Sequence, residues 1–140
     1  RVSDQLGGWI EAAQAAGTAP YVVQGDSIEQ PLLGLRGDPD RGRAIVADRR
    51  TGLCLLCHRA PVPEERSPGN LSTDLSGAGS RWTAGQLRLR VVDSRTLNPA
   101  SLMPAFHRTE GLTRVGPAWR GRPILDAQQV EDVVAYLERL

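Results

Sequence analysis

Lysine is absent from this 140-residue sequence. All seventeen basic residues are arginines, and sixteen acidic residues bring the net charge to +1. A charge this close to balance argues against a protein that is held on nucleic acid by phosphate contacts. Long apolar runs are also missing, and none reaches the ~18 residues that a membrane-spanning helix requires.

Aromatic residues are scarce, at 4% of the chain, although hydrophobic residues make up 40% and charged residues 24%. This composition and length indicate one globular domain. Its core therefore consists mainly of Leu, Val, Ile and Ala, or is filled by something other than side chains. Because the chain begins at Arg1 rather than at methionine, we expect a processed chain, and the lack of a signal peptide excludes no destination.

The two cysteines, Cys54 and Cys57, lie close together and are followed directly by His58. A disulfide between them would close only a very short loop and would therefore stabilise the fold very little. Cys-x-x-Cys-His is the attachment sequence for c-type haem, in which both thiols form thioethers and the histidine binds iron. On one helical turn the three side chains project to the same side. The motif therefore predicts one covalent haem c, which also accounts for the few aromatic residues.

Three other interpretations of the motif remain open. A thioredoxin-like redox pair follows a strand in a βαβ unit, whereas the preceding residues 38–48 have a helical pattern. A zinc site could use Cys54, Cys57 and His58, but His107 is the only other histidine and there is no second cysteine pair. The last alternative is two core cysteines that stand beside a histidine by chance.

From residue 36 onward three helices are expected, over residues 38–48, 83–92 and 126–137, joined by long loops in a mostly α-helical fold. The first begins with Asp38 and Pro39, a typical cap and first position. The second begins with a capping-box pattern at residues 83–86, and residues 126–129 open the third. In the first helix we expect buried side chains at Ala44, Ile45 and Val46. In the last, apolar residues recur at helical spacing, at Val130, Val133, Val134 and Leu137.

The sixth ligand of the haem iron is predicted to be Met103, the only methionine. A thioether favours ferrous haem and suits electron transfer, and Pro99 and Pro104 stiffen the segment that carries it. His107 is the rival ligand, but it stands in a polar stretch that we expect at the surface. An unliganded Met103 would fill a gap in the core.

Two further contacts with the haem site are expected. Arg81 and Trp82 precede the middle helix and offer a guanidinium and an indole N–H to the haem propionates. The backbone carbonyl of Pro68 or Gly69 is expected to accept a hydrogen bond from His58 Nδ1, which would fix the tautomer of the ring.

Residues 1–35 form an N-terminal extension outside the cytochrome-like part, residues 36–140. We expect a helix over 3–16, followed by extended pieces at 20–23 and 28–32. The extension carries enough apolar side chains that leaving it in water would be unfavourable. We therefore expect it to be ordered against the domain or a partner, and we expect deletion of residues 1–30 to leave the haem spectrum intact.

The order of these parts resembles a class I c-type cytochrome over residues 36–140. The combination of motifs is more specific and resembles the SoxX family, the monohaem cytochrome subunits of the SoxAX complexes of sulfur-oxidising bacteria. The motifs lie at residues 25–28, 37–44, 54–58, 69–71, 97–99, 103–106 and 128–137, together with the Pro-rich segment after the haem motif.

The resemblance implies a periplasmic heterodimer with a SoxA-like cytochrome, whose complex oxidatively joins thiosulfate to a cysteine of the SoxYZ carrier, a transient partner. The SoxX subunit accepts electrons from SoxA and passes them to a small soluble cytochrome. No catalytic residue carries over to this chain, because the haem uses both cysteines, so the chain is not catalytic alone within this L-cysteine S-thiosulfotransferase-type complex.

A stand-alone respiratory electron shuttle is the alternative. It would favour a ring of lysines around the haem edge, whereas this chain has none and its arginines are spread from Arg36 to Arg139. A haem sensor would need an open sixth position, which Met103 argues against.

Overall fold

The computed structural model describes residues 17–140, so the helix expected over 3–16 lies outside the described residues. No strand forms in the described part of the chain, where Gln24 and Ser27 make one isolated antiparallel bridge. Its α-helices are α2 (Pro39–Ala47), α3 (Ala78–Arg81), α4 (Ala84–Asp93) and α5 (Ala127–Leu137). Short 3-10 helices lie at η1 (Leu32–Gly34), η2 (Cys54–Leu56), η3 (Ser94–Thr96) and η4 (Pro117–Trp119).

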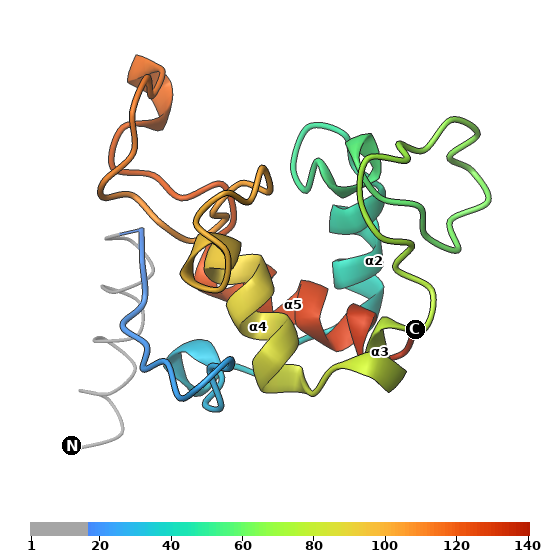
Figure 1. Ribbon diagram of the computed structural model, residues 1–140, viewed down its shortest axis with the longest axis horizontal. Coiled ribbons are helices and arrows are strands. Elements are labelled where there is room, and N and C mark those ends of the chain that lie inside the picture. The colour runs from blue at the N-terminus through green and yellow to red at the C-terminus, as the bar shows by residue number, and fades with distance from the viewer. Residues whose placement is uncertain (1–16) are drawn as a thin grey trace.

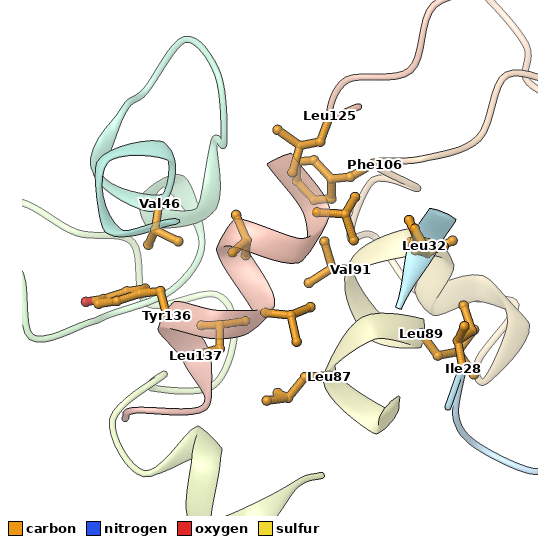
Figure 2. Close-up of a cluster of buried hydrophobic side chains, with 14 of the residues drawn as sticks. Ile28, Leu32, Val46, Leu87, Leu89, Val91, Phe106, Leu125, Tyr136 and Leu137 are labelled. Carbon is orange, nitrogen blue, oxygen red and sulfur yellow. The ribbon is translucent and has the colours of Figure 1, made fainter. Parts of the chain in front are cut away.

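Helix α5 is the centre of the fold, with α2 packed on one side and α4 on the other (Figure 1). Figure 2 shows side chains from all three helices meeting in one apolar cluster. The three predicted helices are confirmed. The mostly α-helical fold with long loops is the one that the resemblance to a class I c-type cytochrome implies. No helix among residues 17–140 is long and apolar enough to cross a membrane.

Each of the three helices begins with the cap that its sequence predicts. The Asp38 carboxylate accepts hydrogen bonds from the first turn of α2, which has Pro39 as its first residue. Thr83 for α4 and Asp126 for α5 form complete capping boxes with the glutamine three residues later. These side chains satisfy backbone N–H groups that have no partner within the helix, so each start is encoded locally.

The buried face of α2 differs from the prediction. Gly42 and Val46 are buried, whereas Ala44 is exposed and Ile45 is only half-buried. A Cβ on Gly42 would lie 1.9 Å from the backbone oxygen of Asp132 in α5. The two helices therefore touch backbone to backbone, and α2 turns its smallest residue toward α5 rather than its more apolar ones.

The segment over residues 17–35 packs against the helices. Ile28 and Leu32 are each 1% exposed and belong to the apolar cluster (Figure 2). The extended piece expected at 28–32 runs into η1, whereas Val22 remains 71% exposed. Because Ile28 is part of the core, we expect removal of residues 1–30 to destabilise the domain itself, and the effect on the haem spectrum stays a prediction.

A buried ion pair fixes this segment to the helices. Arg88 of α4 and Glu131 of α5 form a salt bridge of 2.8 Å, with side chains 5% and 3% exposed. Arg88 also donates to the backbone oxygen of Ile28, and Glu131 accepts from the backbone N–H of Leu32. The pair thus satisfies backbone groups of the incoming segment as well as its own charges.

Candidate haem site

Two loops that are far apart in the sequence line one cavity of about 330 Å³. One wall comes from residues 53–58 with Leu71 and Ser72, and the other comes from the 98–106 segment. Cys54, Cys57, His58 and Met103 all line this cavity. The structure therefore brings together the two predicted thioether positions and both predicted iron ligands.

The cysteine motif forms a 3-10 turn, η2, rather than the α-helical turn that the spacing suggests. Leu53 starts it in the left-handed conformation, with a φ of 61°. The backbone N–H groups of Cys57 and His58 both donate to the carbonyl oxygen of Cys54, at 3.2 and 2.9 Å. These bonds hold the turn tightly enough that all three side chains still reach the same cavity.

Gly69 supports this turn at very close range. Its N–H donates to the carbonyl oxygen of Leu55 at 2.7 Å, and a Cβ at this position would lie 2.0 Å from the carbonyl oxygen of Leu56. Only glycine fits here without displacing the backbone of the cysteine motif. The loop after the motif is therefore part of the site, although its composition indicates only an irregular connection.

The His58 ring is oriented by the backbone carbonyl of Thr73, which lies 2.6 Å from Nδ1. The prediction that Pro68 or Gly69 supplies this carbonyl is wrong, because the carbonyl of Thr73 is the partner of His58 Nδ1. A proton on Nδ1 that is donated to Thr73 leaves Nε2 as the free nitrogen that a metal can bind.

Met103 belongs to a loop whose far end is fastened to α4. Its N–H donates to the Ser101 hydroxyl at 3.3 Å. Beyond it, the N–H groups of Phe106 and His107 donate to the carbonyl oxygens of Val91 and Val92. The methionine wall is thus positioned by the end of α4, and the half-buried Met103 faces the cavity.

His107 is buried, at 1% exposed, and the expectation that it lies at the surface is wrong. Its Nε2 accepts the backbone N–H of Ala19 at 2.8 Å, and its Nδ1 lies 2.8 Å from the carbonyl oxygen of Leu125. Burial lowers the pKa of His107. With both ring nitrogens occupied, His107 connects two segments of the backbone, and in this arrangement it is not a rival to Met103.

Arg81 and Trp82 are placed outside the cavity lining. Arg81 donates to the carbonyl oxygens of Ser76 and Asp74, and the guanidinium of Arg90 lies 3.7 Å from the ring centre of Trp82. The structure therefore does not bring these two residues to the cysteines and His58.

The surroundings of the cysteines bear on the competing interpretations of the motif. Helix α2 precedes it rather than a strand, so the βαβ setting of a thioredoxin-like pair is missing from the described residues. Burial raises the pKa of the Cys54 thiol to about 11, the opposite of what an activated thiolate needs. Nowhere in residues 17–140 do three His, Cys, Asp or Glu side chains gather as metal ligands.

The residues present fit a haem c. Cys54 and Cys57 are not joined by a disulfide, so both are available for thioether bonds. His58 offers one nitrogen, Met103 offers a thioether on the other wall, and Leu53, Leu71 and Phe106 contribute apolar surface. This donor set is the one that c-type cytochromes use.

Sequence reasoning missed several parts of the site. The carbonyl of Thr73 lies fifteen residues from His58, and no local pattern marks it. Leu71 and Leu102 line the cavity yet are 82% and 94% exposed, which places them at its mouth. For Leu71 and Leu102, the sequence offered one signal, which is a large apolar residue inside an otherwise polar loop.

No protein-family model and no curated protein matches the sequence. Among solved structures, a chain of the SoxXA crystal structure from P. pantotrophus matches with a TM-score of 0.79. The two share 37% sequence identity over 87% of this chain and 96% of that chain. With this identity over nearly the whole of its relative, and with the cysteine motif in place, the chain belongs to the SoxX family of cytochrome subunits.

Proposed function

We propose that this chain is the electron-transfer subunit of a periplasmic SoxXA-type heterodimer, with one haem c bound through Cys54 and Cys57. The observation that carries the proposal is the meeting of both cysteines, His58 and Met103 in one cavity. The similarity to a chain of SoxXA supports a SoxA-like partner.

When bound, haem c supplies reversible one-electron exchange between ferrous and ferric iron. The chain's own residues set the conditions for that exchange. Thr73 holds the His58 ring and makes its Nε2 a stronger donor. Met103 is the second ligand in the proposal, and its soft sulfur favours the ferrous state.

Sulfur chemistry is assigned to the partner. Cys54 and Cys57 are the only cysteines, and haem attachment consumes both. Because no thiol remains to react with thiosulfate, the chain accepts electrons while the SoxA-like subunit and the SoxYZ carrier do the conjugation. The electrons then pass to a small soluble cytochrome.

The mouth of the cavity is the proposed route for those electrons. Leu56, Leu71 and Leu102 are 46%, 82% and 94% exposed, and the last two also line the cavity. Apolar side chains that are this exposed beside a redox site are suited to contact with another protein, because that contact removes them from water.

Haem attachment is tested by a pyridine haemochrome spectrum of the reduced protein and by acid–acetone extraction. The spectrum should report one haem c per chain, and the haem should stay with the protein. In the Cys54→Ser, Cys57→Ser double variant any bound haem should become extractable. Extractable haem in the parent protein, or free thiols in the native holoprotein, would overturn the attachment.

The Met103 assignment is tested by the weak near-infrared band that methionine-to-iron charge transfer gives in the oxidised protein. Met103→Ala should abolish this band and lower the reduction potential. The matched control is Leu102→Ala, which changes the neighbouring exposed residue and should leave the band in place. A band that survives Met103→Ala would show that another residue is the sixth ligand.

The partner is tested by co-expression with a SoxA-like cytochrome, followed by size-exclusion chromatography and cell fractionation. We expect a stable complex that is released with the periplasmic contents. A chain that stays monomeric and exchanges electrons freely with many acceptors would support the stand-alone shuttle instead.

A further inference from the structure

The residue that closes α4 lies beside the proposed sulfur ligand. The hydroxyl oxygen of Ser94 is 3.3 Å from Met103 Sδ and 2.6 Å from the carbonyl oxygen of Arg90, one helical turn earlier. Ser94 and Met103 are both half-buried. A hydroxyl carries a single hydrogen, so this hydrogen is shared between a strong carbonyl acceptor and a weak sulfur acceptor.

The backbone around Ser94 is firmly held. Before it, the Asp93 carboxylate accepts from the N–H of Arg95 and from the guanidinium of Arg108. The carbonyl oxygens of Val91 and Val92 anchor the end of the methionine loop. Because both partners are fixed to the same end of α4, the approach of the hydroxyl to the sulfur is built into the scaffold.

A thioether sulfur has two lone pairs, of which a metal uses only one. The remaining pair accepts a hydrogen bond without competing with the metal. We propose that Ser94 is a positioning residue for Met103, because its hydroxyl engages this second lone pair and holds the sulfur in place for iron. The inference rests on the proposed role of Met103 and adds a residue that acts through it.

This contact has two measurable effects. The hydroxyl directs the positive end of its dipole toward the sulfur, which disfavours the added positive charge of ferric iron and raises the reduction potential. It also fixes one position of a flexible side chain, so an external ligand must break the contact to displace Met103. One net hydrogen bond of ~1 kcal/mol or less corresponds to roughly a two- to fivefold change in such an equilibrium.

The test compares Ser94→Ala, Ser94→Thr and the parent as holoproteins. Ser94→Ala should lower the midpoint potential and tighten imidazole binding to the oxidised protein by roughly two- to fivefold. Ser94→Thr keeps the hydroxyl and should restore both properties toward the parent. Ser80→Ala, an exposed serine in α3, is the matched control and should change neither.

The outcomes separate this proposal from the function on which it depends. A parent protein without the near-infrared band, or with a band that Met103→Ala leaves intact, removes Met103 as ligand and both proposals with it. A parent with the expected band, whose potential and imidazole affinity are unchanged by Ser94→Ala, overturns the role of Ser94 alone. Equal shifts in the alanine and threonine variants also overturn it, because the hydroxyl would then not be the cause.

Discussion

The two halves of the molecule are held together in different ways. Where α2 crosses α5, the backbones touch, and Gly42 has no room for even a Cβ. Where the two loops meet, they line a cavity of about 330 Å³. In the helical half, side chains and backbone pack closely together, and this packing makes that half rigid. In the loop half, Cys54, Cys57, His58 and Met103 line one cavity instead of packing against one another.

The same contrast holds for polar groups. Every buried side-chain nitrogen or oxygen within residues 17–140 has a hydrogen-bond partner. In the helical half these partners are often deeply buried, as for Arg88 and Glu131. Around the cysteine motif the ion pairs are more exposed, as for Arg49 with Glu65, whose side chains are 51% and 15% exposed. Substitutions in the two halves should therefore differ greatly in cost.

The largest effect is expected at the helix crossing. Gly42→Val should destabilise the protein by more than about 4 kcal/mol, because overpacking that side chains can relieve already costs about 1–3 kcal/mol and here the clash is with backbone. Soluble yield and thermal melting measure it. Gly116→Ala is the control, since the nearest atom to a Cβ there lies 4.0 Å away. A parent-like melting temperature for Gly42→Val would refute the close crossing.

The second largest loss of stability is expected at the buried ion pair of Arg88 and Glu131. Glu131→Gln leaves the Arg88 charge without its partner in the core, and we expect a loss of about 3 kcal/mol in urea unfolding. The double variant Arg88→Met, Glu131→Leu removes both charges and should recover part of that loss. If the single substitution costs less than about 1 kcal/mol, the pair does not anchor the 17–35 segment as described.

Low pH should weaken the contacts by which the His107 ring joins Ala19 to Leu125. Because burial lowers the pKa of His107, the unfolded chain takes up a proton at a higher pH than the folded chain does. The free energy of unfolding should therefore fall as pH drops through the ordinary histidine range near ~6.5. In His107→Asn this part of the pH dependence should disappear, although the variant is less stable overall. Urea titrations at several pH values measure the difference, and an equal slope in both proteins would refute it.

The smallest effect is expected on the loop half. Arg49 holds the pKa of Glu65 at about 2, which is below its usual value near 4.5. The pair contributes stability above pH ~4.5 and loses it as the pH falls toward 2. The stability difference between the parent and Arg49→Gln should thus be small at neutral pH, weaker in high salt and absent near pH 2. A difference that persists in acid would point to another cause.

Local sequence predicted what depends on local contacts. The starts of α2, α4 and α5 were correct because the caps at Asp38, Thr83 and Asp126 bond within their own first turn. The cysteine motif and Met103 were also placed in one site, from the chemistry that their residue types share.

What sequence could not predict depends on distant segments. The polar neighbours of His107 suggest a surface position, but Ala19 and Leu125, which bury and bond its ring, lie 88 and 18 residues away. Ala44 is more apolar than Gly42, yet the approach of α5 decides which of them faces inward. Both errors come from judging a residue by its neighbours in sequence.

The backbone of the wall that carries the cysteine motif is held mainly by hydrogen bonds within a short stretch of chain, although Leu55 also packs into the central core. Gly69 bonds to Leu55, Ser72 to Cys57 and Thr73 to His58, all within residues 52–75. The methionine wall instead depends on α4 and, through His107, on residue 19. The backbone of the first wall is therefore held mainly from within its own stretch of chain, whereas the second wall takes its shape only where the helical half is packed. In the proposed function, ligation by Met103 thus depends on the whole fold, and attachment at the cysteines depends mainly on one loop.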